Sequence, residues 1–192
     1  MLIFNGITNK VTGQKICFLL TGEDTEGRSL EMESHYPALS PEPLTHYHPN
    51  QEEIFQVLKG ELTVRMNGEI KVYVKGDTLC IPKGTPHSMW NAGFGNTIVH
   101  WKVMPALDME YFLTTMMLLA NTGRTNKSGI PPLPLRVFLL KKYQHTFRLS
   151  NPSSGLLNIL FIVLKPVFFF NSYHRQYCEA AIVRGSRESA IS

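Results

Sequence analysis

The chain has few cysteines for its 192 residues, only Cys17, Cys80 and Cys178. Their number is odd and none lies in a CxxC pair, which argues against a disulfide framework and a cysteine-rich zinc site. Cys80 has apolar neighbours and is expected to be a buried, unreactive thiol. Sparse cysteine fits a reducing compartment, so we expect a cytoplasmic protein. The N-terminus lacks a basic leader followed by an apolar run, which predicts no signal peptide.

The sequence also lacks the common motifs of nucleotide and DNA binding. It has no Walker A or Rossmann glycine pattern, and "GFGN" (93–96) is not followed by a helical pattern. No helix-turn-helix signature is present, so we expect no nucleic-acid partner. Acidic residues become scarce after residue 104: the net charge is −2 over residues 1–104 and +6 over residues 105–192. A basic second part is compatible with an anionic partner, but a solvated surface is the simpler interpretation.

What the first hundred residues do contain is a series of short strand patterns separated by turn residues. The candidate strands cover residues 15–20, 29–36, 44–48, 53–58, 61–66, 69–74, 77–82, 87–91 and 97–104. Many short strands at close spacing are typical of a sandwich or barrel. Asn67-Gly68 predicts a hairpin between two of them, because a type I′ turn needs two residues at positive φ.

The composition changes after Pro105, where three segments have helical patterns. The first, residues 107–123, has Asp108 as a candidate N-cap and ends at Gly123. The others are residues 131–149, which follow a proline-rich entry, and residues 154–170, which follow "NPSS". We therefore divide the chain into a β domain of residues 1–106 and a helical extension of residues 107–192.

The longest apolar run, residues 156–170, is too short to span a bilayer. It has 15 residues and is interrupted by Lys165 and Pro166, whereas a spanning helix needs about 20 residues. Burying its 12 apolar side chains is worth roughly 18–36 kcal/mol, so something should cover them. We expect the barrel or a second subunit, which would make a homodimer. Peripheral membrane contact through 156–170 is the alternative.

Two histidines and a glutamate form the first candidate site. His46 and His48 are one residue apart, so in a strand their side chains point to the same face. Glu53 opens the next strand and shares its face with Phe55 and Val57, which have the character of core residues. Glu53 is therefore expected to point inward beside the histidines. A buried carboxylate without a partner is costly, and a metal ion removes that cost.

A further histidine, His87, follows a Pro- and Gly-rich turn and begins another strand. With His46, His48 and Glu53 it completes a set suited to one divalent transition metal, which could be Fe, Mn, Ni, Zn or Cu. The inward side chains near the ligands would either form an apolar pocket wall or simply fill the barrel; they are Phe55, Val64, Met66 and Met89. His100 could line the pocket as an acid or base, although an exposed or core position is the more common one for such a residue.

These stretches resemble the paired motifs of the cupin superfamily. The first motif, G-x5-H-x-H-x(3,4)-E-x6-G, is matched by His46, His48, Glu53 and Gly60, with Ser40 in place of its leading glycine. The second motif, G-x5-P-x-G-x2-H-x3-N, is matched at every position, by Gly76, Pro82, Gly84, His87 and Asn91. The resemblance covers roughly residues 10–105 and leaves the helical extension outside the cupin core.

The resemblance implies a mainly β fold, a double-stranded β-helix or jelly-roll barrel, followed here by the α-helical extension. It implies that His46, His48, Glu53 and His87 are metal ligands, that Gly60, Gly76 and Gly84 are turn residues and that Asn91 is structural. A metal-dependent enzyme of dioxygenase or isomerase type, acting on a small oxygen-rich or aromatic molecule with Glu53 as catalytic base, is one expectation. A non-catalytic small-molecule sensor whose tail mediates dimerisation or membrane association is the alternative. A metal-free carbohydrate- or lipid-binding protein is the third.

Overall fold

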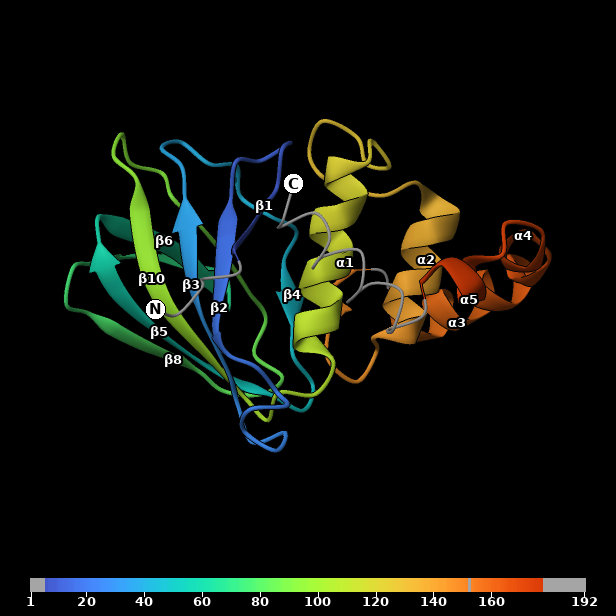
Figure 1. Ribbon diagram of the computed structural model, residues 1–192, viewed down its shortest axis with the longest axis horizontal. Coiled ribbons are helices and arrows are strands. Elements are labelled where there is room, and N and C mark those ends of the chain that lie inside the picture. The colour runs from blue at the N-terminus through green and yellow to red at the C-terminus, as the bar shows by residue number, and fades with distance from the viewer. Residues whose placement is uncertain (1–5, 152, 178–192) are drawn as a thin grey trace.

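The computed structural model of the protein describes residues 6–151 and 153–177, and Cys178 lies outside them. Within these residues the chain forms a β-barrel followed by a group of helices (Figure 1). The strands are β1 (Gly6–Thr8), β2 (Lys15–Leu20), β3 (Leu30–Tyr36), β4 (His46–Tyr47), β5 (Glu52–Lys59), β6 (Glu61–Met66), β7 (Glu69–Val74), β8 (Thr78–Ile81), β9 (His87–Trp90), β10 (Thr97–Met104) and β11 (Arg148–Leu149).

Two antiparallel sheets make up the barrel. One has the order β1-β2-β3-β10-β5-β8 and the other the order β11-β4-β9-β6-β7. Strands that are consecutive in the chain repeatedly fall in opposite sheets, as β4 and β5 do, which is the crossing pattern of a jelly roll. The expected fold class, mainly β with a C-terminal helical extension, is thereby confirmed.

Alternation along the strands fills the space between the sheets. In β10, Val99, Trp101 and Val103 are buried, whereas Ile98 and Lys102 are only partly buried on the other face. The period of two is what a strand requires when one face packs on a core. The sequence therefore determines the inner face of the barrel strand by strand.

The turns carry the residues that positive φ angles demand. Asn67 and Gly68 have φ of 51° and 90° between β6 and β7, which agrees with the predicted type I′ hairpin. Gly60 joins β5 to β6 with φ of 74°, and the predicted turn glycines Gly76 and Gly84 also have positive φ. At Gly60 a side chain is excluded by space as well, because an added Cβ would lie 2.6 Å from the carbonyl oxygen of Asn96.

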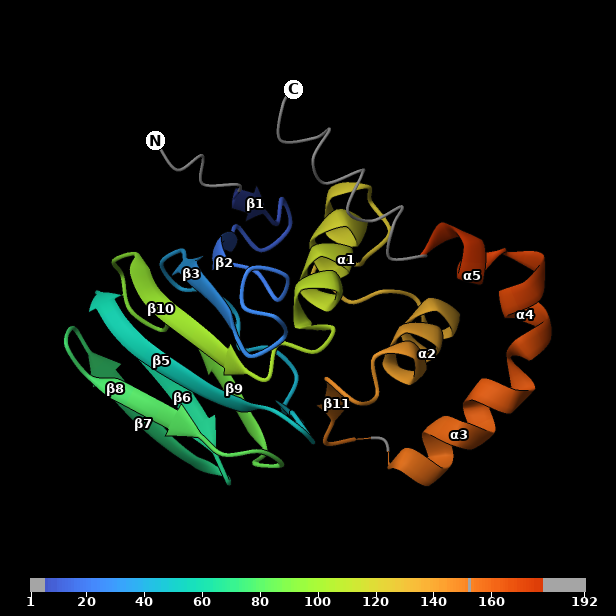
Figure 2. The same ribbon diagram turned by 60° about the horizontal axis from the view of Figure 1, so that its bottom comes forward.

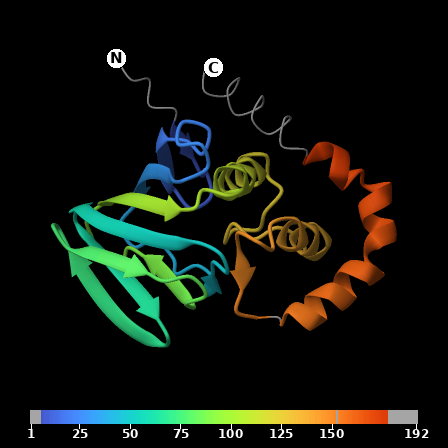
Figure 3. The ribbon, with the colours of Figure 1, turned by 90° about the horizontal axis from the view of Figure 1, so that it is seen from below.

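Five helices follow the barrel in the part of the chain that the structure describes. They are α1 (Met109–Asn121), α2 (Leu133–Lys142), α3 (Ser154–Val163), α4 (Lys165–Phe170) and α5 (Tyr173–Gln176). They lie in successive layers outward from the barrel, with α1 nearest to it, then α2, then an outer arc of α3, α4 and α5 (Figures 2 and 3). Apolar residues of α1 and α2, among them Phe112 and Leu135, belong to the same buried cluster as the barrel core. The helices are therefore packed onto the barrel through a continuous apolar interior.

The prediction of one helical segment over residues 131–149 is wrong at its C-terminal end. Helix α2 ends at Lys142, a turn follows, and Arg148 and Leu149 form β11 beside β4. Backbone pairing with a strand a hundred residues earlier overrides the local pattern there, because the open edge of β4 offers hydrogen-bonding groups that a further helical turn would leave unused. Strand β11 extends the sheet that carries the histidines.

The apolar run 156–170 is only half covered. Leu157, Leu160, Phe161 and Leu164 pack toward the core, and Phe168 is buried. The opposite face remains exposed, with Ile162 63% and Phe170 82% accessible. One face of the run is therefore covered, as we expected. The cover comes mainly from α2 and not from the barrel itself. Among the described residues no helix has the length and hydropathy to cross a membrane.

Gly60→Ala tests the packing at the β5–β6 turn. We expect it to lower the free energy of unfolding by about 2–4 kcal/mol, because the strain of a positive φ adds to the overpacking against Asn96. Gly76→Ala is the matched control: its φ is 96°, but nothing lies within 4 Å of an added Cβ, so it should cost only the strain of a positive φ, about 1–2 kcal/mol. Urea unfolding of both variants measures the difference, and equal losses would contradict this account of Gly60.

Candidate metal centre

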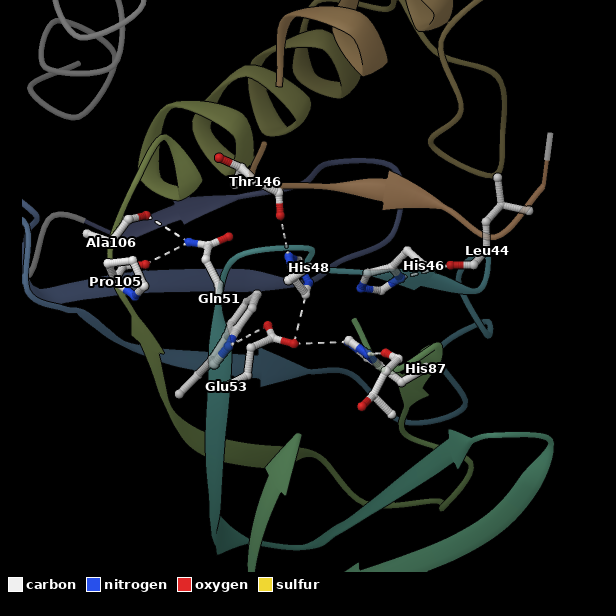
Figure 4. Close-up of polar contacts among 11 residues, drawn as sticks. Leu44, His46, His48, Gln51, Glu53, His87, Pro105, Ala106 and Thr146 are labelled. Carbon is white, nitrogen blue, oxygen red and sulfur yellow. Dashed lines mark hydrogen bonds and ion pairs between the residues drawn. The ribbon is translucent and has the colours of Figure 1, made fainter. Parts of the chain in front are cut away.

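The candidate centre lies between the two sheets at the end of the barrel that faces the helices (Figure 4). Strand β4 provides His46, and His48 follows directly after the strand. The paired strand β9 begins with His87, which lies opposite His46 in the register. Glu53 comes from β5 in the other sheet. The centre is thus built where the two sheets approach each other, and no single strand could assemble it.

The four side chains converge. Nitrogen atoms of His46, His48 and His87 all lie within 4.8 Å of one another, so the cluster could hold a metal ion. Glu53 Oε2 lies 3.4 Å from His48 Nε2 and 3.0 Å from His87 Nε2. His48, Glu53 and His87 are almost completely buried. The parity argument for His46, His48 and Glu53 therefore placed these groups correctly relative to one another.

Backbone carbonyls determine which nitrogen of each imidazole carries the proton. Nδ1 of His46 lies 3.0 Å from the carbonyl oxygen of Leu44 and Nδ1 of His87 lies 2.9 Å from that of Thr85. Nδ1 of His48 lies 2.8 Å from the carbonyl oxygen of Thr146. A carbonyl can only accept, so each Nδ1 is the donor. In a neutral imidazole the other nitrogen, Nε2, then has a free lone pair.

While the three imidazoles are neutral, the centre consequently brings acceptors together without a donor. Nε2 of His48, Nε2 of His87 and Oε2 of Glu53 are all buried and none has a hydrogen bond. His87 Nε2 and Glu53 Oε2 are 3.0 Å apart. When the proton of the neutral imidazole is on Nδ1, Nε2 cannot donate, so no hydrogen bond joins these two atoms. Lone pairs that face one another away from water are unfavourable unless they share a cation. A metal-binding histidine usually donates the N–H of its other ring nitrogen to a group such as a backbone carbonyl.

The pKa shifts follow from burial and from this proximity. Burial, with the neighbouring His87 and His48, lowers the pKa of His46 to about 3, and burial lowers the pKa of His48. Burial alone would raise the pKa of Glu53, but the surrounding histidines outweigh it and the pKa is lowered. For His87, burial is outweighed by Glu53 and by the carbonyl of Thr85, so its pKa is raised. A metal ion would compete with the proton at His87 and would find Glu53 already ionised.

Glu53 is oriented by a residue that sequence reasoning did not assign to the site. The indole Nε1 of Trp101 donates to Glu53 Oε1 over 3.1 Å, which leaves Oε2 for the centre. Trp101 stacks on Phe55 with ring centroids 5.2 Å apart, because the two residues are opposite each other in the β10–β5 register. Burial raises the pKa of Tyr36 to about 12, and the nearby negative charge of Glu53 contributes to this rise.

The helical extension also contributes. Besides the carbonyl of Thr146, it supplies Phe147, whose ring stacks on His46 at 4.8 Å and meets His48 edge-on at 5.9 Å. These residues lie almost a hundred positions from the histidines in sequence. No local pattern in the sequence points to them, and only the pairing of β11 with β4 brings them to the centre.

The other predicted pocket residues divide into two groups. Phe55, Val64 and Met89 are buried in the barrel core, and Met66, half-buried, lies opposite His87 in the β6–β9 register. His100 does not line the site. It lies on the outer face of β10, 3.5 Å from Glu31, because its neighbour Trp101 occupies the inner face. The expected burial of Cys80 is wrong: on the edge strand β8 its side chain faces outward and is exposed.

The geometry accords with a comparison to known protein families. The family model described as "Cupin domain" matches residues 33–101, which contain all four converging residues. Residues 33–101 are a cupin domain. The match ends within β10, so the helical extension lies beyond it.

Comparison with individual proteins gives shorter or more distant similarities. An uncharacterized protein of Bacillus subtilis (strain 168), YdbB, is 46% identical over 43 residues, which are 22% of this chain and 38% of that protein. The match thus spans less than half the length of this curated relative. Among solved structures, a predicted oxalate decarboxylase from Thermotoga maritima is 24% identical, with a TM-score of 0.46 over 48% of this chain and 80% of its own. A sugar phosphate isomerase from Silicibacter pomeroyi is 17% identical, with a TM-score of 0.47 over 53% and 71%.

One remaining motif position of the cupin domain, Asn91, supports the loop that connects β9 to β10. Asn91 is completely buried, and its side-chain amide donates to the carbonyls of Pro37 and Gly95 at 3.0 and 2.6 Å. Its backbone N–H donates to Ser40 Oγ over 2.9 Å. Ser40, which replaces the leading glycine of the first motif, therefore gains a hydrogen-bonding role. Asn91 makes no contact with the four converging residues among those described, which fits a structural role.

Glu53→Gln tests whether acceptors meet without a donor. The amide NH2 in place of Oε2 would donate to a histidine Nε2, so the metal-free variant should melt at or above the wild-type temperature at pH 8. Glu53→Ala should lose about 1–3 kcal/mol, because it leaves Trp101 Nε1 buried without a partner. Both variants should lose the rise in melting temperature that Ni(II) or Mn(II) gives the wild type. Glu33→Gln, on the outer face, is the control. A Glu53→Gln variant as unstable as Glu53→Ala would contradict the description of the centre.

Proposed function

We propose that this protein is a metal-dependent enzyme, of dioxygenase or isomerase type, that acts on a small oxygen-rich or aromatic molecule. The observation that carries the proposal is the convergence of His46, His48, His87 and Glu53 with their acceptor atoms inward and no donor among them. Such a set fits one divalent transition metal, Fe, Mn, Ni, Zn or Cu, because imidazole and carboxylate ligands suit all of these. When bound, the metal would supply Lewis-acid or redox chemistry toward an oxygen-bearing substrate.

The residues of the chain would divide the work around that metal. The histidines would hold it, each fixed by a backbone carbonyl on its outer nitrogen. Glu53 has two possible tasks at Oε2, as a ligand and as the base that takes a proton from the substrate. Its lowered pKa keeps it ionised at neutral pH, which both tasks require, and Trp101 holds the other oxygen in place. The apolar residues around it, such as Phe55, would exclude water.

A non-catalytic role is the second candidate, as a small-molecule-binding or sensor protein. The burial of Nε2 of His48, Nε2 of His87 and Oε2 of Glu53 favours it, since a turnover site needs access for its substrate. Oxygen uptake or isomerisation by the metal-loaded protein across a panel of phenols, diketones and sugars would support the enzyme. Tight binding from the same panel without turnover would support the sensor.

His48→Ala tests the metal centre itself. We expect elemental analysis of the native protein to find about one transition metal per chain, and the His48→Ala variant to retain roughly a tenth or less, since it removes one ligand and the contact with the extension. His100→Ala is the matched control, a β-strand histidine with a carboxylate neighbour outside the centre, and it should retain the metal. A wild-type protein without metal that cannot be loaded would favour the metal-free binding protein instead.

We also propose that a second copy of the chain covers the exposed face of α3 and α4. This face consists of apolar side chains, namely Leu156, Ile159, Ile162, Val163, Phe169 and Phe170. Helix α3 contains no charged residue and α4 contains only Lys165. The cores of protein interfaces are depleted of charge in this way, whereas helices that bind membrane surfaces carry several Lys or Arg beside the apolar face. A homodimer is therefore favoured over peripheral membrane contact.

The double variant Ile159→Asp, Ile162→Asp tests the dimer. Both side chains are exposed, so the variant should fold and keep its metal, but it should elute as a monomer where the wild type elutes as a dimer. Light scattering coupled to gel filtration measures both masses. The wild type could instead be a monomer that floats with anionic vesicles, while the double variant does not float. That outcome would contradict the dimer and support membrane contact.

A further inference from the structure

The segment between α2 and α3 reaches back to the histidines. We call residues 145–150 the strap. It is tied to the histidine-bearing segment at both ends: Asn50 Nδ2 donates to the carbonyl of His145 over 2.8 Å, and the Ser150 N–H donates to the carbonyl of Thr45 over 3.0 Å. Between these ties, Arg148 and Leu149 pair with Tyr47 and His46. The strap therefore keeps a fixed position along β4.

Phe147 is the strap residue that faces the centre. Its ring lies against His46 and His48 with centroid distances of 4.8 and 5.9 Å. On its other side it stacks on Phe112 of α1 at 4.5 Å, and Phe112 in turn meets Tyr143 edge-on at 5.5 Å. The ring is thus held between the histidines and the helical layer. It is half-buried, so it lies between the solvent and the interior.

Among the described residues, Phe147 is the one aromatic ring outside the histidines that makes a ring contact with His46 or His48. The inner end is closed by Glu53, Trp101 and Phe55, and His87 lies on the neighbouring strand. Nε2 of His48 and Nε2 of His87 are inaccessible to solvent. Because Phe147 contacts both His46 and His48, a molecule that approaches these histidines from the helical side would meet its ring.

We propose that Phe147, supplied by the helical extension and not by the cupin domain, is a specificity-determining residue that limits the size of the molecule able to reach the metal. The inference rests on the proposed metal centre. It assigns a function to the extension: the strap carries both the carbonyl that orients His48 and the ring that restricts access. Bulky ligands are excluded while small anions enter.

The experiment uses the full chain loaded with Cu(II), whose visible absorption and EPR signal respond to added ligands. Azide is the small probe and 4-phenylimidazole the bulky one. Phe147→Ala should raise the affinity for 4-phenylimidazole by roughly tenfold or more relative to azide, because the hydrophobic shell controls access to the metal. Phe147→Leu, which keeps much of the volume, should fall between the wild type and Phe147→Ala.

Phe161→Ala is the control for loss of an aromatic ring in the extension. Phe161 is also half-buried, and its ring neighbour is Phe168, on the side away from the centre. It should leave the ratio of the two affinities unchanged. If the wild type binds both probes equally and neither Phe147 variant changes their ratio, the inference is overturned. If the wild type fails to hold Cu(II), the proposed metal centre has failed, and the two failures are thereby distinguished.

Discussion

The structure depends on an electrostatic conflict at the centre of the fold. Imidazole lone pairs and a carboxylate oxygen point at one another between two sheets, where water does not reach them. Each outer imidazole nitrogen is committed to a backbone carbonyl, so the rings cannot turn to relieve the repulsion without losing a hydrogen bond. A proton shared between His87 and Glu53 resolves part of it, and a divalent cation would resolve all of it.

The surrounding fold keeps this arrangement in place. The sheets bring β4 and β9 on one side against β5 on the other, Trp101 fixes the carboxylate, and the extension completes the cover. Asn50 and Gln51, in the short turn between β4 and β5, bind the strap and the linker to α1 respectively: the Gln51 side chain donates to the carbonyls of Pro105 and Ala106, both at 2.9 Å. The turn that separates the histidines from the glutamate thus also connects the barrel to the helices.

Much of this could be predicted from short-range patterns. Strand alternation brings His46 and His48 to one face and Glu53 to the inner face, and the spacing of the paired motifs adds His87. Prediction from the sequence fails where the register between distant strands decides which side chain faces the centre. His100 and Trp101 are adjacent, and only the pairing of Trp101 with Phe55 tells which of them faces inward. Thr146 and Phe147 follow a helix and continue its apolar pattern, so their position at the centre depends wholly on the pairing of β11 with β4.

The unbroken apolar interior has a consequence for how the chain responds to heat or protease. Because Phe112, Leu135 and Phe168 belong to the same cluster as the barrel residues Val99 and Leu62, the helices cannot separate without exposing the barrel. Loosening of either part is then transmitted to the other, and the chain should melt in a single cooperative step. An ion held by the histidines would in that case protect peptide bonds in the outermost helices, far from any atom that it touches.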